Sequence, residues 1–123
     1  MKLTLLIGIG SFIGGICRYL FAHFIQNKYF SAFPYGTLWV NITGCFIIGL
    51  VFGLSEKASV PTEWRLFLAT GFCGGFTTFS AFSNETLALL RDGQFWSAAL
   101  YITASVFFGL LATFVGISLF KLF

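Results

Sequence analysis

The sequence predicts an all-α membrane protein in which one domain, residues 1–123, is built from four transmembrane helices. Hydrophobic residues make up 58% of the chain and charged residues only 9%, whereas a soluble domain carries roughly 25% charged residues. Four apolar runs are each about 20 residues long or longer, which matches the length of a helix that crosses a bilayer. Membrane strands are about 10 residues long and alternate in polarity, so these runs are predicted to be helices.

The first span is expected at residues 3–24 and the second at residues 36–54. The chain begins with Met1-Lys2 before an apolar run, as a secretory signal peptide does. This run reaches about 20 residues and three more apolar runs follow it. We therefore interpret it as a span that the mature protein keeps. The linker to the second span contains Lys28 and Pro34.

The third span is expected at residues 64–90 and the fourth at residues 95–122. A polar loop, residues 55–63, precedes the third span, and Thr62 is placed to cap its helix. The turn at residues 91–94 separates the third span from the fourth. Four spans place both termini and the 55–63 loop on one side of the membrane.

The basic residues divide almost evenly between the two sides. One side carries Lys2, Lys57, Arg65 and Lys121, and the other carries Lys28, Arg91 and, if its side chain reaches the interface, Arg18. An excess of Lys and Arg on one side orients a membrane protein. Because four against three is hardly an excess, our hypothesis is that the chain inserts in both orientations.

Small residues recur at a spacing of four in every span. The pairs are Gly10 and Gly14, Gly49 and Gly53, Gly71 and Gly75, and Ala112 and Gly116. Such pairs let helix backbones approach closely in lipid, where dispersion drives the packing of helices. The helices are therefore predicted to pack tightly, within one chain or between chains.

Composition and motifs exclude several classes of function. Four spans leave no room for a soluble catalytic domain, and the basic residues form no stripe that would bind nucleic acid. Cys17, Cys45 and Cys73 lie inside apolar runs without the spacing of a zinc site, and we expect no disulfide. The chain has no HExxH motif and a single histidine, His23 at a span end, so an enzyme is not expected.

The segment from Gly71 to Ser83 in the third span carries the strongest signal. Gly74-Gly75 followed by Thr77-Thr78 is a poor helix interior. One interpretation is a helix break at mid-membrane, whose free carbonyls could hold a cation such as sodium. The other is close glycine packing without a break. The residues alone do not decide between them.

Aromatic rings, hydroxyl groups and one amide gather around this segment. Phe76, Phe79 and Phe82 are spaced by three, so we expect them to share a helix face. The edge of an aromatic ring is positive and attracts an anion, although such a stripe is also typical of packing. The polar groups are Thr77, Thr78, Ser80 and Ser83 in the third span and Asn41 in the second.

Two charged residues lie within the spans. Glu85 falls about one turn past Phe82, and an acid inside the membrane is a functional candidate by default. It could instead reach the interface or a water-filled vestibule. Arg18 could reach the interface or pair with a carboxylate or backbone carbonyls, and we expect its role to be structural.

These residues resemble the Fluc family of fluoride channels, also called CrcB proteins, over essentially the whole chain. The matching segments are Gly14-Gly15-Ile16-Cys17-Arg18-Tyr19, Gly36-Thr37-Leu38-Trp39-Val40-Asn41 with Gly44, and Gly71 to Ser83 with Glu85. There is one minor departure: Ala81 stands where the family commonly has threonine.

The resemblance implies a passive, fluoride-selective channel in the cell membrane. It implies an antiparallel, dual-topology homodimer with two pores, each built by both subunits, and a third helix that is broken at mid-membrane. The pore or fluoride-binding residues it implies are Phe79, Phe82, Asn41, Ser80, Thr78, Tyr101, Ser105 and Glu85. It also implies a structural Na⁺ at the dimer interface on the carbonyls of Gly74 and Thr77, with Arg18 and Gly75 in structural roles.

Two other functions fit the length and the composition. A small proton-coupled multidrug-type exporter needs an embedded carboxylate, for which Glu85 is the sole candidate. A non-transporting subunit that anchors a membrane complex would need only the glycine pairs. The polar third span argues against the anchor, since an anchor has no use for buried hydroxyl groups and an amide.

Overall fold

The computed structural model describes residues 1–29 and 31–122, and within them all regular secondary structure is helical. The helices are α1 (Lys2–Lys28), α2 (Tyr35–Lys57), α3 (Thr62–Arg65), η1 (Leu66–Cys73), α4 (Gly74–Phe76), α5 (Phe79–Arg91) and α6 (Phe95–Lys121). Four stretches are long and apolar enough to cross a membrane: α1, α2, α3 to α5 taken together, and α6. The prediction of an all-α protein with four membrane-spanning helices is therefore confirmed.

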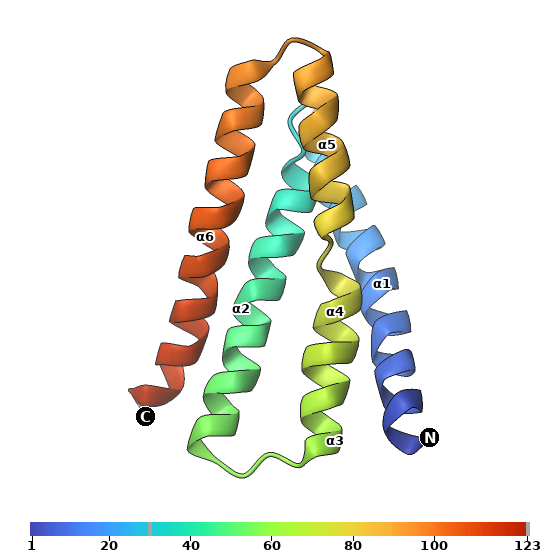
Figure 1. Ribbon diagram of the computed structural model, residues 1–123, viewed down its shortest axis with the longest axis vertical. Helices are drawn as coiled ribbons and strands as arrows, with labels where there is room; N and C mark the ends of the chain where they lie inside the picture. The colour runs from blue at the N-terminus through green and yellow to red at the C-terminus, as the bar shows by residue number, and fades with distance from the viewer. Residues whose placement is uncertain (30, 123) are drawn as a thin grey trace.

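Helix α2 occupies the centre of the bundle. It packs against α6 on one side and against α1 and η1 on the other, and the third span lies beside α1 (Figure 1). Both termini and the α2–α3 loop lie at one end of the molecule, as four spans require. The other end carries the loop before α2 and the turn at positive-φ Gly93.

The third span is interrupted. α4 ends at Phe76, Thr77 and Thr78 are extended, and α5 begins at Phe79. Before the interruption, Leu66–Cys73 form a π-helix, a wide turn that often marks functional sites. The structure thus decides the alternative that the sequence left open, and the break is present.

Close glycine packing accompanies the break and does not replace it. A Cβ atom on Gly14 would overlap the carbonyl oxygen of Phe72, and one on Gly75 would overlap that of Ser11. Between α2 and α6, a Cβ atom on Gly116 would lie 2.6 Å from the carbonyl oxygen of Phe46. The glycines therefore set how closely α1 approaches the third span and α6 approaches α2.

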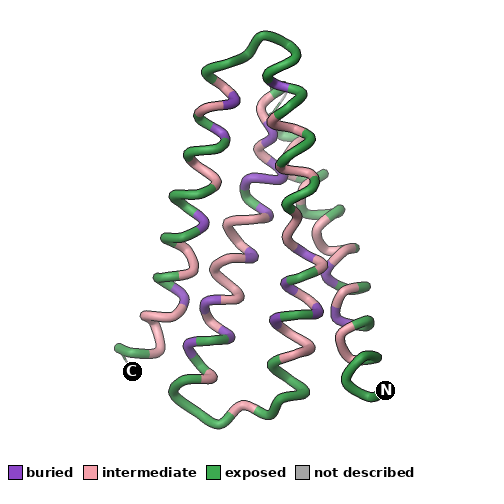
Figure 2. The backbone as a smooth tube through the Cα atoms, in the orientation of Figure 1, coloured by how far each residue is buried: buried purple, intermediate pink, exposed green. Residues whose placement is uncertain are grey.

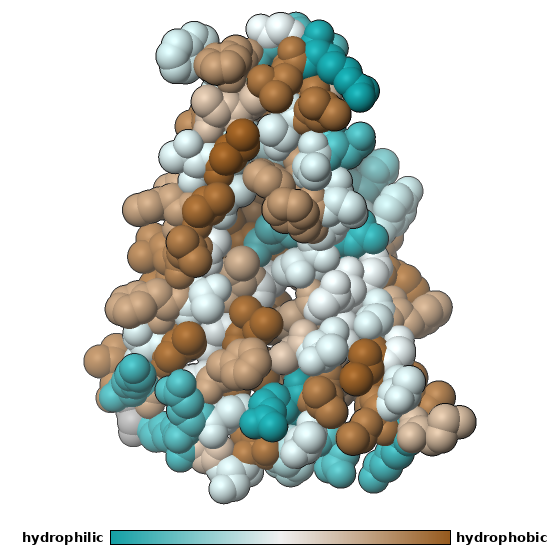
Figure 3. Space-filling model, in the orientation of Figure 1, coloured by the Kyte–Doolittle hydropathy of each residue, from teal (hydrophilic) through white to brown (hydrophobic). Residues whose placement is uncertain are grey.

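The surface is apolar along the spans. Figure 2 shows buried positions on the inner sides of the helices and exposed positions on the outer sides of α1 and α6. Large side chains such as Phe12, Leu110 and Phe114 are more than half exposed. In Figure 3 the hydrophilic residues gather mainly toward the two ends of the visible face. Lipid is the solvent that fits this distribution, and the chain is a multi-pass membrane protein.

The close approach of α1 to the third span yields a paired prediction. Gly14→Ala should lower the free energy of unfolding by about 1–3 kcal/mol, because the new methyl group meets backbone atoms that cannot move aside cheaply. Its neighbour Gly15 has open space around it, so Gly15→Ala should leave stability unchanged or slightly raised. Thermal unfolding in detergent measures both variants. Equal stability of the two would contradict the proposed packing.

Candidate functional site

The two residues of the break in the third span, Thr77 and Thr78, form hydrogen bonds with the helices on either side. Thr77 and Thr78 have ψ angles of 156° and 115°, and β-branched residues after two glycines form helix poorly. The Thr78 hydroxyl caps α5 by accepting a hydrogen bond from the backbone N–H of Ala81 at 3.1 Å. The Thr77 hydroxyl donates to the carbonyl of Cys73 at 2.8 Å. The Thr77 hydroxyl thus bonds a carbonyl at the end of the helix before the break, and the Thr78 hydroxyl caps the start of the helix after it.

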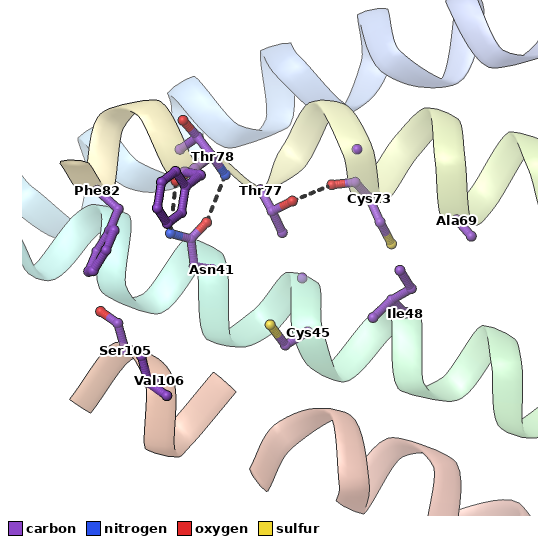
Figure 4. Close-up of a pocket in the computed structure, with 13 residues that line it drawn as sticks. Asn41, Cys45, Ile48, Ala69, Cys73, Thr77, Thr78, Phe82, Ser105 and Val106 are labelled. Atoms are coloured by element: carbon purple, nitrogen blue, oxygen red, sulfur yellow. Dashed lines mark hydrogen bonds between the residues drawn. The ribbon is translucent and has the colours of Figure 1, made fainter. Parts of the chain in front are cut away.

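Asn41 of α2 holds the break from the side. Its Oδ1 accepts from the backbone N–H of Thr78 at 2.9 Å, and its Nδ2 donates to the Thr78 carbonyl at 3.2 Å (Figure 4). The side-chain amide therefore pairs with one residue of extended backbone as a neighbouring strand would. The Asn41 amide has two N–H donors, of which one is used by the Thr78 carbonyl and one remains.

Arg18 of α1 also reaches the break. Its Nε donates to the carbonyl of Gly75 at 3.3 Å. In a continuous helix this carbonyl would accept a hydrogen bond from the backbone N–H of Phe79, and the break removes that bond. The Arg18 side chain therefore turns into the bundle. Arg18 therefore no longer counts among the basic residues at the ends of the bundle. The end with both termini carries four, and the other end carries two: Lys2, Lys57, Arg65 and Lys121 against Lys28 and Arg91.

Several carbonyls at the break are left without their helical partners, among them those of Gly74 and Thr77. In a continuous helix the carbonyl of Gly74 would accept from Thr78, but that N–H donates to Asn41. The carbonyl of Thr77 would accept from Ala81, whose N–H donates to the Thr78 hydroxyl. Unwound carbonyls of this kind are the groups that hold Na⁺ in broken membrane helices. The carbonyl oxygens of Gly74 and Thr77 thus belong to the chemical class of ligand that an alkali cation takes.

A pocket of about 390 Å³ opens beside the break. Most of its walls are apolar, and the polar groups come from a few side chains (Figure 4). Its lining residues are Asn41, Gly44, Cys45, Ile48, Ala69, Cys73, Gly74, Thr77, Thr78, Phe79, Phe82, Ser105 and Val106. Every span except α1 contributes to this lining.

The two phenylalanines of α5 lie together in this pocket. Their ring centroids are 5.5 Å apart with the planes tilted by 45°. Phe79 is 79% exposed, whereas Phe82 also packs against Tyr101, with centroids 5.1 Å apart. Side chains from α5 thus present aromatic surface to the pocket.

The expectation that Phe76 shares the face of Phe79 and Phe82 is wrong. Phe76 is buried at 4% exposure and packs against Phe21 and Phe72. The spacing of three holds only within a continuous helix. The extended residues at 77 and 78 change the direction of the chain between Phe76 and Phe79.

Ser105 of α6 contributes an unused hydroxyl group. Its Oγ is buried and has no hydrogen-bond partner among the described residues, and Ser105 lines the pocket. Figure 4 shows this hydroxyl pointing toward the Phe82 ring. A buried hydroxyl without a partner is costly, so this position is suited to a ligand that accepts a hydrogen bond.

Glu85 and Tyr101 form a cluster next to the pocket and do not line it. The Tyr101 hydroxyl donates to Glu85 Oε2 at 3.2 Å, and the Thr37 hydroxyl donates to Glu85 Oε1 at 2.7 Å. Tyr101 is fully buried. Ser80 also lies outside the pocket lining and contacts the Thr78 hydroxyl through its Oγ at 3.2 Å.

The sequence analysis named neither Thr37 nor the cysteines Cys45 and Cys73 as site residues. Thr37 lies four residues before Asn41, so the two share a face of α2, and this spacing was the available signal. Cys45 and Cys73 line the pocket. Both thiols are free, as is that of Cys17.

Comparison with known proteins gives a consistent result. The family model described as CrcB-like protein, Camphor Resistance (CrcB), matches residues 5–117. A protein of Flavobacterium psychrophilum is 47% identical, with 98% of each chain covered. One of Chlorobium phaeobacteroides is 47% identical over 96% of this chain and 92% of its own. One of Thermus thermophilus is 46% identical over 91% of this chain and 88% of its own. Each of the three is named fluoride-specific ion channel FluC.

The cap of α5 can be tested at one atom. Thr78→Val keeps the shape of the side chain but loses the acceptor for the Ala81 amide, and it should cost about 1 kcal/mol of stability. Hydrogen exchange at the Ala81 amide should accelerate in this variant. Thr78→Ser keeps the acceptor oxygen and should exchange as the wild type does. Unchanged protection of Ala81 in Thr78→Val would remove the cap from the account.

Proposed function

Because the chain belongs to the CrcB-like family, we propose that it is a fluoride-selective channel that lets fluoride leave the cell passively across the cell membrane. Its relatives are named fluoride-specific ion channels at 45–47% identity over nearly the full chain. Within the molecule, one observation carries the proposal. The pocket at the break brings together an unpartnered buried hydroxyl, a half-used amide and two aromatic rings.

Fluoride is a small, strongly hydrated anion that only accepts hydrogen bonds. To enter a dehydrated path it needs donors that replace its water, each holding it weakly enough for release. Ser105 supplies an O–H and Asn41 a second N–H, while Phe79 and Phe82 add aromatic rings, whose edges are positive. Donors of this kind favour fluoride, the halide that accepts the strongest hydrogen bonds.

In this proposal, the residues next to the pocket hold the lining residues in position. Tyr101 packs on Phe82 and donates to Glu85, so the Glu85 carboxylate fixes the ring beside the path. Thr78 and Ser80 share a hydrogen bond at the start of α5. Glu85 accepts hydrogen bonds on both oxygens and lies outside the pocket lining. This placement disfavours it as the embedded carboxylate of a proton-coupled exporter.

The proposal includes an antiparallel homodimer with Na⁺ between the subunits. The carbonyls of Gly74 and Thr77 lack helical partners, and Gly74 has open space where a Cβ atom would stand. Two carbonyls are too few to hold a cation alone, so a second copy would supply the rest. When bound, the cation would offset the carbonyl dipoles where two breaks meet. With Arg18 inside the bundle the basic residues divide four against two, an excess that is larger than four against three but small enough to permit insertion in both orientations.

Efflux from liposomes tests the proposed transport directly. Purified protein is placed in liposomes loaded with potassium fluoride or potassium chloride, and a potassium ionophore balances the charge. We expect rapid fluoride release and no chloride release in the absence of a proton gradient, since the path offers hydrogen-bond donors suited to a small, strongly hydrated anion. Ion-selective electrodes follow both anions. No fluoride release from folded protein, or equal release of chloride, would refute the function.

The ring edges can be tested separately. Phe79→Ile keeps apolar bulk but removes the positive edge, and it should slow fluoride efflux about tenfold. Phe114 is similarly exposed at 67% and lies outside the pocket lining, so Phe114→Ile is the matched control and should conduct as the wild type does. An unchanged rate in Phe79→Ile would mean that this ring serves packing alone.

Dual orientation predicts labelling from both sides. Ser59 lies in the exposed α2–α3 loop, so Ser59→Cys is introduced after Cys17, Cys45 and Cys73 are replaced by alanine. An impermeant maleimide applied to intact cells should label about half of the chains, because no strong charge bias selects one orientation. Complete labelling, or none until the cells are opened, would show a single orientation and contradict the antiparallel dimer.

A further inference from the structure

A second cavity lies at the end of the molecule that carries both termini. Its volume is about 370 Å³, and its lining residues are Lys2, Leu6, Glu63, Trp64 and Phe67. It is formed where the start of α1 meets the start of the third span, two segments that lie at the same end of the bundle (Figure 1). It shares no residue with the pocket at the break, so the proposed transport does not use it.

This cavity is polar at its rim and apolar in its depth. Lys2 and Glu63 stand at the outer ends of their helices, whereas Leu6 and Phe67 lie four residues further along, about one turn deeper in the membrane. Trp64 is 58% exposed and meets the Phe67 ring edge to face at 6.1 Å. Tryptophan gathers at the membrane–water interface. The cavity therefore has the layout of a site for an amphipathic molecule.

The two charges on the rim select the kind of head group. Lys2 and Glu63 line the same cavity with opposite charges, and neither side chain has a hydrogen-bond or ion-pair partner within the described residues. A purely anionic head group would suit Lys2 but would be repelled by Glu63. A head group that carries both a phosphate and an amine can satisfy both side chains at once.

We propose that this cavity binds one phospholipid with a zwitterionic, primary-amine head group. The phosphate accepts a hydrogen bond from Lys2 Nζ, and the head-group ammonium donates to the Glu63 carboxylate. The acyl chains follow the apolar side of the cavity along Leu6 and Phe67. The lipid would tie the start of α1 to the start of the third span.

Native mass spectrometry tests the proposal on full-length protein stripped of lipid. The protein is titrated with phosphatidylethanolamine, phosphatidylcholine or phosphatidylglycerol of the same acyl chains. We expect phosphatidylethanolamine to bind at least about fivefold more tightly than either of the others, because only it satisfies both rim charges with hydrogen bonds. Glu63→Gln should remove this preference, because Glu63 is the partner of the amine. Lys2→Gln should weaken the binding of all three lipids, because all three carry the phosphate. Glu56→Gln and Lys57→Gln change the same charges outside the cavity and should keep both the preference and the affinity.

Three results would overturn the proposal. Equal affinity for phosphatidylethanolamine and phosphatidylcholine would show that the head-group amine is not recognised. Tightest binding of phosphatidylglycerol, lost only in Lys2→Gln, would assign the cavity to an anionic lipid. A change of oligomeric state in Lys2→Gln or Glu63→Gln, visible in the same spectra, would assign it to contact with a second copy. None of these results depends on fluoride transport.

Discussion

The pairing of the Asn41 amide with the Thr78 backbone is the interaction on which the rest of the site depends. A membrane has no water to satisfy the N–H and C=O groups that a broken helix exposes, and each unsatisfied group costs several kcal/mol. Asn41 satisfies both groups of Thr78, Arg18 satisfies the carbonyl of Gly75, and the Thr78 hydroxyl satisfies the Ala81 amide. Side chains from two other segments and from the break itself therefore make an irregular backbone tolerable in the membrane.

The same bonds create the chemistry of the site. Because they occupy the N–H groups of Thr78 and Ala81, the carbonyls of Gly74 and Thr77 lose their helical partners. Because the chain changes direction at residues 77 and 78, α5 presents Phe79 and Phe82 to the pocket while Phe76 stays in the packing against α1. One local interruption thus separates structural aromatic residues from those that face the proposed path.

The sequence predicted the architecture well and the site in part. Composition and run length were sufficient for four membrane helices, since a bilayer allows few other solutions. Periodicity failed at Phe76, because a three-residue spacing carries no information across a break. The partner of Arg18 could not be read from the chain, since Gly75 lies 57 positions away and offers only a backbone carbonyl. The role of Thr37 depends on Glu85, 48 positions away, and appears only once α2 and α5 are placed together.

In the proposed channel the Asn41 amide both holds the break and leaves one donor for fluoride. Fluoride efflux from liposomes containing Asn41→Asp tests this dual role most directly, with circular dichroism and size exclusion to establish that the variant is folded. A carboxylate can still accept from the Thr78 N–H, but it repels the Thr78 carbonyl and any passing anion. We expect folded protein whose fluoride efflux is slowed at least about tenfold. Efflux at the wild-type rate would contradict this role of Asn41.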